Sequence, residues 1–392
     1  MSDRLLHADF VRIVASHTLA ALGWSSMLLL PVYLAHVGAS RAEIGAIMSA
    51  SAMAGLLVRP AVGVLLDRWG RRPVIAIGAT VQAIAMGAVA GIEAPDAFAF
   101  GVRSLFGLGT AAVFTGYFTL ATDLVPTRRR TEGIALFGIS GLVPLSINPL
   151  SQTIGIDAPA LRWFLPATGV LVLLSVWPLA GIRERPRTTG KGPGGLAVLR
   201  ALGRRPLWSA WVATLAFATL VVVFQAFATV TAHARGIPRP ADIWLSYAIG
   251  AVAVRLFGAR LPDRVGPHNL IAPAMAALAG GILALAVAAD REAVLLAGLL
   301  GGLGHGIGFP VLTSQVASRS PESMRGSALA GFTGLWDCSF LIAPPLLGRI
   351  ADRDGDAAML TTAATLAVFA LAAWMALEAR FGGASRELDA EA

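Results

Sequence analysis

The sequence consists of about twelve apolar runs, each near the ~20 residues that an α-helix needs to cross a lipid bilayer. Short charged segments separate the runs, and only 14% of all residues are charged, against roughly a quarter in an ordinary globular domain. This composition excludes a soluble fold and predicts an all-α polytopic membrane protein that sits in the lipid bilayer. The predicted spans are residues 10–36, 42–66, 73–92, 97–122, 132–155, 162–182, 207–231, 241–261, 269–289, 293–317, 326–348 and 358–380.

Basic residues are concentrated in one set of loops. The even-numbered loops between the predicted spans hold seventeen Lys and Arg residues, and the odd-numbered loops hold seven. Because Lys and Arg collect on the cytoplasmic side of membrane proteins, we predict that both termini are cytoplasmic, which requires an even number of spans. The first apolar run is too long for a signal peptide, and we interpret it as an uncleaved span. At the start of the second run, Ser40 and Glu43 form the pattern of a capping box.

Several classes of function are disfavoured by composition. The formal net charge of +8 does not indicate a nucleic-acid partner, because the basic residues lie in short loops between membrane spans. The single cysteine, Cys338, excludes a disulfide within the chain and a thiolate metal cluster. The sequence has no G-x-x-x-x-G-K-[ST] loop for an ATP-driven pump, and its His and carboxylate residues are too scattered for an enzyme. We expect no cofactor or metal, and we also expect a monomer.

A charged segment occurs twice, half a chain apart. The copies lie at residues 63–73 and 258–268, and an arginine, Arg59 or Arg255, precedes the aspartate of each copy by eight residues. The predicted units are an N-terminal six-helix bundle at 1–182, a cytoplasmic linker loop at 183–206 and a C-terminal six-helix bundle at 207–392. Two similar halves related by an axis along the membrane normal are typical of transporters, whose site lies between the halves.

The first copy resembles the signature of the major facilitator superfamily, G-x-L-x-D-R-x-G-R-[RK], and the resemblance extends over essentially the whole chain. The matching residues are Gly63, Leu65, Asp67, Arg68, Gly70, Arg71 and Arg72, and the degenerate second copy keeps Asp263 and Arg264. The resemblance implies a twelve-helix fold of two pseudo-symmetric six-helix bundles, with a gate at which these residues hold the cytoplasmic helix ends together. The alternative is that the arginines only fix the topology.

Two further patterns of the family can be compared with this chain. The segment from Arg103 to Ala112 is similar to the fourth-helix pattern R-x-x-x-G-x-G-x-A-A, in which the resemblance implies that the arginine takes part in proton transfer. The alternative is that Arg103 extends to the outer membrane surface. The fifth-helix antiporter pattern G-P-x-x-G-G fits poorly, since residues 148–153 keep the proline but lose the glycines. This departure weakens an assignment as a drug:proton antiporter.

Two ionisable residues are predicted to lie near the centre of the bilayer. Burying a charge there costs ~2.5–3.5 kcal/mol on insertion scales, so such residues need a partner or a task. We hypothesise that Asp337, tuned by His305 on a glycine-rich helix, binds and releases the coupling proton. The alternative is a hydrogen bond between helices that only fastens the second bundle.

Other polar residues have less defined predictions. Because Arg59 and Arg255 occur in both halves, a structural role at the cytoplasmic gate is favoured over contact with substrate. Amides and indoles in a mostly apolar cavity suit a small amphiphilic solute, and the alternative is that these residues only fill space between helices. The candidate cavity residues are Trp24, Asn148, Gln152 and Gln225.

Together these patterns predict a secondary active transporter in the inner membrane of a bacterium. It would move a small-molecule substrate by alternating access, with protons as the coupling ion, and the short loops resemble those of the exporter branch of the family. The alternatives are a proton-coupled importer of a sugar or organic acid, and a membrane sensor that kept the fold without transporting. Such sensors usually carry an added soluble signalling domain.

Overall fold

The computed structural model describes residues 6–125, 130–184, 195–258, 261–321 and 324–381, and nearly all of them are helical. The α-helices are α1 (Ala8–Ser25), α2 (Leu30–His36), α3 (Arg41–Trp69), α4 (Arg71–Ala88), α5 (Ala97–Leu124), α6 (Arg130–Ile139), α7 (Ile147–Thr153), α8 (Leu161–Leu174), α9 (Val176–Ala180), α10 (Gly195–Leu202), α11 (Trp208–Ala234), α12 (Asp242–Phe257), α13 (Leu261–Val265), α14 (Ile271–Val287), α15 (Arg291–Ser318), α16 (Arg325–Asp354) and α17 (Asp356–Phe381). Short 3₁₀ turns are η1 (Ser26–Leu29), η2 (Val89–Gly91), η4 (Val143–Ser146), η5 (Arg205–Leu207) and η6 (Pro267–Leu270).

Within these ranges, nine helical segments are long and apolar enough to cross a membrane. The other three predicted spans are also helical. The fifth is divided into α6, η4 and α7, and Pro144 and Pro149 contribute to the break because proline removes a backbone donor. The eighth corresponds mainly to the short α12, and the eleventh to α16, a long helix with Asp337 in its interior. Helix is therefore present at all twelve predicted positions.

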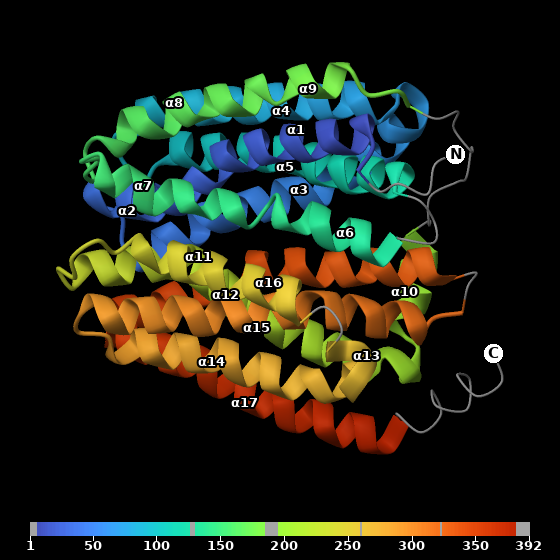
Figure 1. Ribbon diagram of the computed structural model, residues 1–392. Coiled ribbons are helices and arrows are strands. Elements are labelled where there is room, and N and C mark those ends of the chain that lie inside the picture. The colour runs from blue at the N-terminus through green and yellow to red at the C-terminus, as the bar shows by residue number, and fades with distance from the viewer. Residues whose placement is uncertain (1–5, 126–129, 185–194, 259–260, 322–323, 382–392) are drawn as a thin grey trace.

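The helices form two groups (Figure 1). Helices α1 to α9 lie on one side of the molecule and α11 to α17 on the other. Helix α3 of the first group and α16 of the second pack lengthwise against each other and form the largest contact between the groups. We call the end of the bundle at which α1 begins and α17 ends the proximal end, and the opposite end, with the turn from α2 to α3, the distal end.

The internal repeat is visible in the packing of glycines. A side chain at Gly107 on α5 would collide with the backbone of Ser51 on α3, and one at Gly302 on α15 would collide with the backbone of Tyr247 on α12. The glycines are thus at equivalent places in the two halves, as are the residues they contact. In both halves the missing side chain lets two helices approach closely.

The repeated charged segments form sharp turns. In the first copy Gly70, with φ of +100°, joins α3 to α4, and in the second Gly266, with φ of +83°, follows α13. Glycine adopts such backbone angles without the steric cost that other residues incur. The predicted capping box is also confirmed, because the Ser40 side chain accepts from the Glu43 backbone and the Glu43 carboxylate accepts from the Ser40 backbone.

Candidate functional site

An ion pair joins the two halves in the middle of the bundle. Nη2 of Arg59 on α3 lies 2.7 Å from Oδ2 of Asp337 on α16, and it donates a hydrogen bond of 2.9 Å to Oδ1. Ten residues separate Arg59 from Trp69 at the proximal end of α3, which corresponds to about 15 Å of helix. Both side chains are partly buried, with 28% and 15% of their surfaces exposed. We call this contact the central ion pair.

The central ion pair corrects the partner predicted for Asp337. The glycine-rich helix predicts contact between His305 and the carboxylate, but the imidazole Nδ1 of His305 is hydrogen-bonded to the hydroxyl of Tyr247 at 2.6 Å. The imidazole lies instead within an aromatic cluster, with ring centroids 5.9 Å from Phe217, 6.2 Å from Phe309 and 6.2 Å from Trp336. The proton-coupling role of Asp337 and His305 stays a prediction.

A second histidine is buried in the first half. His17 on α1 is 7% exposed, and its Nδ1 is hydrogen-bonded to the hydroxyl of Ser140 at 2.7 Å. Trp24, predicted to line a cavity, packs against this imidazole with ring centroids 5.2 Å apart. The rings of Tyr117 and Phe137 also pack against it, with centroids at 5.1 and 4.4 Å from that of the imidazole. Each half therefore contains a histidine surrounded by aromatic rings.

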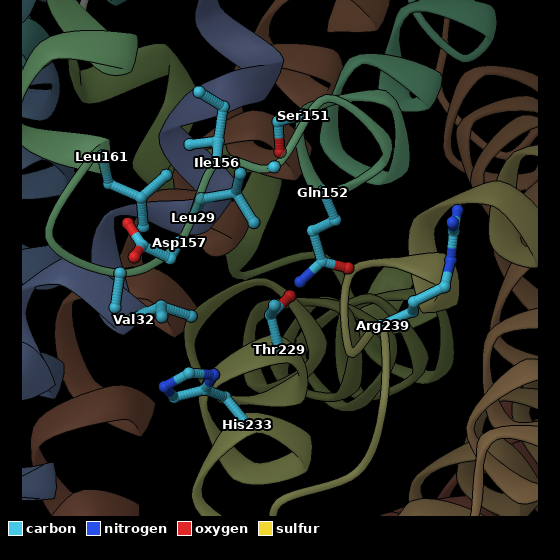
Figure 2. A pocket seen from close by; sticks show the side chains of 12 residues that line it. Leu29, Val32, Ser151, Gln152, Ile156, Asp157, Leu161, Thr229, His233 and Arg239 are labelled. Carbon is cyan, nitrogen blue, oxygen red and sulfur yellow. The ribbon is translucent and has the colours of Figure 1, made fainter.

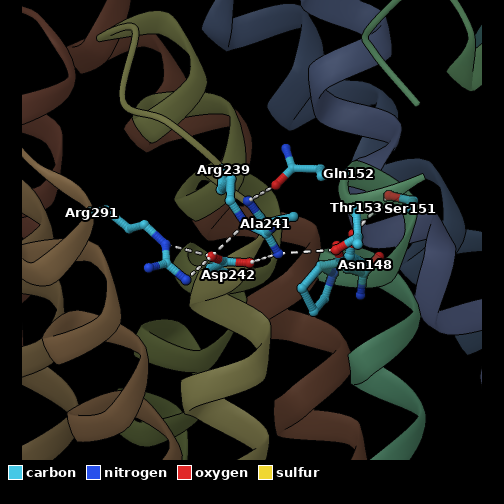
Figure 3. A network of polar contacts seen from close by, with 9 residues as sticks. Asn148, Ser151, Gln152, Thr153, Arg239, Ala241, Asp242 and Arg291 are labelled. Atoms are coloured by element: carbon cyan, nitrogen blue, oxygen red, sulfur yellow. Dashed lines mark hydrogen bonds and ion pairs between the residues drawn. The ribbon is translucent and has the colours of Figure 1, made fainter. Parts of the chain in front are cut away.

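At the distal end, polar contacts join the loop before α12 to α7 (Figure 3). The backbone N–H of Ala241 donates to Oε1 of Gln152 at 2.9 Å, and Arg239 donates to the hydroxyl of Thr153 at 3.1 Å. Asp242 is fully buried and holds both Arg239 and Arg291, with Oδ2 at 2.9 and 2.6 Å from their guanidinium nitrogens. The hydrogen bond to Asp242 raises the pKa of Arg239. We call the contacts of Ala241 and Arg239 with α7 the first latch.

A second set of contacts joins the distal ends of α3 and α16. The carboxylate of Asp352 accepts the backbone N–H groups of Arg41 and Ala42 at 2.7 and 2.8 Å. The guanidinium of Arg41 is paired with Asp356 at 2.9 Å. Carboxylates at a helix N-terminus satisfy free N–H groups and complement the helix dipole, so this second latch closes the seam between the halves at the start of α3.

A cavity of about 340 Å³ lies between the halves at the distal end (Figure 2). Its polar wall includes Gln152, Asp157, Thr229, His233 and Arg239. Of the four residues predicted to line a substrate cavity, Gln152 is at this place. The others occupy different environments: Trp24 lies beside His17, Asn148 is fully buried and donates to the carbonyl of Leu145, and Gln225 is half-buried on α11.

The signature residues lie at the proximal end, as their loop position predicts. Gly63, Asp67 and Arg68 occupy the last turns of α3, while Gly70 forms the turn and Arg71 and Arg72 begin α4. Arg71 is paired with Asp123 of α5 at 3.0 Å. The backbone N–H groups of Arg71 and Arg72 donate to Glu184 at 3.1 and 2.7 Å, so a residue at the start of the linker caps α4.

In the second copy Asp263 and Arg264 lie on α13, and the side chain of Asp263 is outside the described part of the structure. The gate role of both copies stays a prediction.

Arg103 is buried rather than extended to the surface, which corrects the alternative considered for it. Its side chain lies on α5 with 6% of the residue exposed, and its guanidinium stands 4.8 Å from the ring centroid of Phe106. Its Nε and Nη1 atoms have no hydrogen-bond partner within the described ranges. The proton-transfer role of Arg103 stays a prediction. The described residues contain no group of three or more His, Cys, Asp or Glu that could hold a metal ion.

Comparisons with known proteins support one family. The sequence model of the Major Facilitator Superfamily matches residues 13–344 and 243–391. The chain is 25% identical to the multidrug resistance protein MdtL of Klebsiella pneumoniae over 78% of this chain and 79% of that protein. It is 26% identical to a gentisate transporter of Corynebacterium glutamicum over 86% and 80%. The solved nucleoside transporter NupG has the same fold, with a TM-score of 0.75, 16% identity and coverage of 95% and 98%. The chain therefore belongs to the major facilitator superfamily and is a multi-pass membrane transporter of that family.

Proposed function

We propose that the protein exports a small amphiphilic solute across the inner membrane of a bacterium by alternating access, driven by protons. Similarity to bacterial proteins, one of them named for multidrug resistance, supports efflux and this location. The distribution of Lys and Arg among the loops supports a cytoplasmic proximal end with both termini there. In this orientation the two latches hold the halves together on the periplasmic side.

The central ion pair is the observation that carries the proposal. It joins the two halves at a depth where an unpaired charge is costly, and it is formed while the distal latches are closed. Alternating access requires the halves to rock against each other, and contacts between packed helices must then break and form again. In an ion pair between arginine and aspartate, the carboxylate is the group that loses its charge by binding a proton.

The proposed cycle follows from the charges. When Asp337 is ionised, its attraction to Arg59 favours the state in which α3 and α16 are held together. Proton binding neutralises the carboxylate and removes this attraction, so the state closed at the distal end loses stability relative to the alternative state. Proton release re-forms the pair. Solute and proton move in opposite directions if their binding is mutually exclusive, so that the transporter changes state with the solute bound in one direction and with the proton bound in the other.

Proteoliposomes with an internal pH dye test this function. A panel of amphiphiles, sugars and organic acids is added to vesicles that carry wild type, Asp337→Asn or Asp354→Asn. The last variant is a matched control, because Asp354 is an exposed carboxylate at the distal end of the same helix. We expect solute-dependent proton movement in wild type and the control, and its loss in Asp337→Asn. Equal proton movement in all three proteins would contradict the role of Asp337.

A second candidate function is proton-coupled uptake of an organic acid. The similarity to a protein named as a gentisate transporter, over more than four fifths of this chain, favours it. The same vesicles distinguish the two directions. With an imposed proton gradient, export predicts that solute and protons move in opposite directions across the membrane. Uptake predicts that they move in the same direction.

A further inference from the structure

The internal repeat gives Arg255 the same place in the second half that Arg59 has in the first. Arg59 extends from α3 across to α16, and Arg255 extends from α12 across to α6 of the other half. There it meets Gly138 so closely that any side chain at that position would collide with its Nη1 atom. The side chains of both arginines thus cross the boundary between the halves. In the sequence, each arginine lies about one helical turn before its copy of the charged segment.

The two arginines differ in the residue that each meets in the other half: Arg59 meets a carboxylate and Arg255 meets a glycine. The repeat offset that superposes Pro149 on Pro344 places the apolar Leu142 at the position equivalent to Asp337, so the repeat supplies no acid there. Among the described residues none is paired with Arg255 in a salt bridge or hydrogen bond. The boundary between the halves therefore carries one cation whose charge the described residues do not neutralise. Such a charge in a membrane protein is costly unless a ligand or another group compensates it.

The surroundings of Arg255 are aromatic. Its guanidinium is close enough to interact electrostatically with Tyr247 and His305. These two residues are hydrogen-bonded to each other at 2.6 Å. Trp336 lies beside His305 with ring centroids 6.2 Å apart, and its Nε1 is buried without a hydrogen-bond partner among the described residues. This wall combines π faces with an unused N–H donor, and the guanidinium of Arg255 is close to two of its rings, an arrangement that suits a flat apolar body with an anionic group.

We propose that Arg255 binds the anionic group of the transported solute, and that the substrate class is an aromatic or amphiphilic carboxylate whose apolar body lies against Tyr247, His305 and Trp336. The inference rests on the proposed transport function and adds the recognition site to it. A guanidinium can hold a carboxylate with two parallel hydrogen bonds, which a lysine cannot. The solute then supplies the counter-charge that Leu142 does not, and Arg255 serves substrate binding where Arg59 serves the contact between halves.

Binding to purified protein tests the inference without transport. The probes are 2-naphthoate and 2-naphthamide at pH 7.5, because they share one apolar body and differ in charge. Wild type is compared with Arg255→Gln and Arg255→Lys, and with Arg353→Gln as a matched control that removes an exposed arginine, 86% accessible, at the distal end. Affinity is followed by quenching of tryptophan fluorescence, and elution as a single monodisperse peak shows that each variant is folded.

We expect wild type to bind the carboxylate roughly tenfold or more tightly than the amide, in the range of a charge-assisted hydrogen bond. Arg255→Gln should lose this preference, Arg255→Lys should keep part of it, and Arg353→Gln should match wild type. Equal affinity of wild type for both probes, or no binding of either probe to wild type, overturns the inference. This outcome needs wild-type protein alone, so it holds even if the variants fail to fold. A preference unchanged in Arg255→Gln also overturns it.

The failure of this inference is distinct from failure of the proposed function. If neutral amphiphiles drive proton movement through wild type but naphthoate is not preferred, the transporter is coupled as proposed and Arg255 is not its anion site. If naphthoate is preferred and Asp337→Asn still moves protons like wild type, the anion site stands and the coupling mechanism does not.

Discussion

The carboxylate of Asp337 and the guanidinium of Arg59 meet at 2.7 Å, although the residues belong to different halves of the molecule. The contact joins α3 of the first half to α16 of the second. In the same structure the distal latches are closed, while at the proximal end Arg71 contacts Asp123 of the first half and Glu184 of the linker. The ion pair therefore belongs to a state that is held together at the distal end.

The first prediction concerns the stability of the central ion pair. Arg59→Gln leaves Asp337 partly buried without its counter-charge, and we expect it to lower stability by about 2 kcal/mol, below the ~3–5 kcal/mol seen when one partner of a fully buried pair is removed. The double variant with Asp337→Asn should recover much of the loss, because both charges are then absent. Thermal unfolding of all four proteins in detergent gives the coupling energy. Additive losses would show that the residues do not interact.

The second prediction concerns two glycines with opposite surroundings. Gly302→Ala places a Cβ against the backbone of Tyr247, where α12 and α15 touch, and should destabilise the protein by ~1–3 kcal/mol through overpacking. Gly63→Ala is its matched control, because no atom lies within 4 Å of the added Cβ. The melting temperature of Gly63→Ala should be equal to or above that of wild type. A larger loss in Gly63→Ala than in Gly302→Ala would contradict the helix packing described above.

The third prediction tests the first latch. Cysteines at Gln152 and Ala241, introduced after Cys338→Ser, should be bridged by a short bifunctional thiol reagent, since the two residues share a 2.9 Å hydrogen bond. The cross-link keeps the distal end closed, so transport should stop and return on reduction. Each single cysteine treated with the same reagent serves as the control. Full transport activity in the cross-linked protein would mean that the distal end does not open.

The spans, the repeat and the capping box of Ser40 and Glu43 were predictable because each depends on residues close together in the sequence. The position of Asp337 in the interior of a long helix was predictable for the same reason. Its partner was not predictable, since Arg59 is 278 residues away and the contact depends on the rotation of two helices about their axes. The buried Asp242 was missed too, although Arg239 three residues earlier is a local signal of an ion pair.

The fourth prediction fixes the orientation. Alkaline phosphatase, which is active only in the periplasm, should give no signal when fused after Arg205 in the linker, and a strong signal when fused after Gly38 in the distal turn. The reason is the bias of Lys and Arg toward the even-numbered loops. Expression of both fusions is checked by immunoblot. The reverse pattern of activity would place the proximal end in the periplasm.

The most direct test of the account is a pair of distances between spin labels, measured by electron paramagnetic resonance in wild type and in Asp337→Asn, both lacking Cys338. One pair reports the distal end, at the exposed Glu93 and Arg353, and the other reports the proximal end, at the exposed Trp69 and Val265. Because Asp337→Asn imitates the protonated carboxylate, we expect the distal distance to lengthen and the proximal distance to shorten. Unchanged distances, or a change of the same sign at both ends, would contradict control of alternating access by the central ion pair.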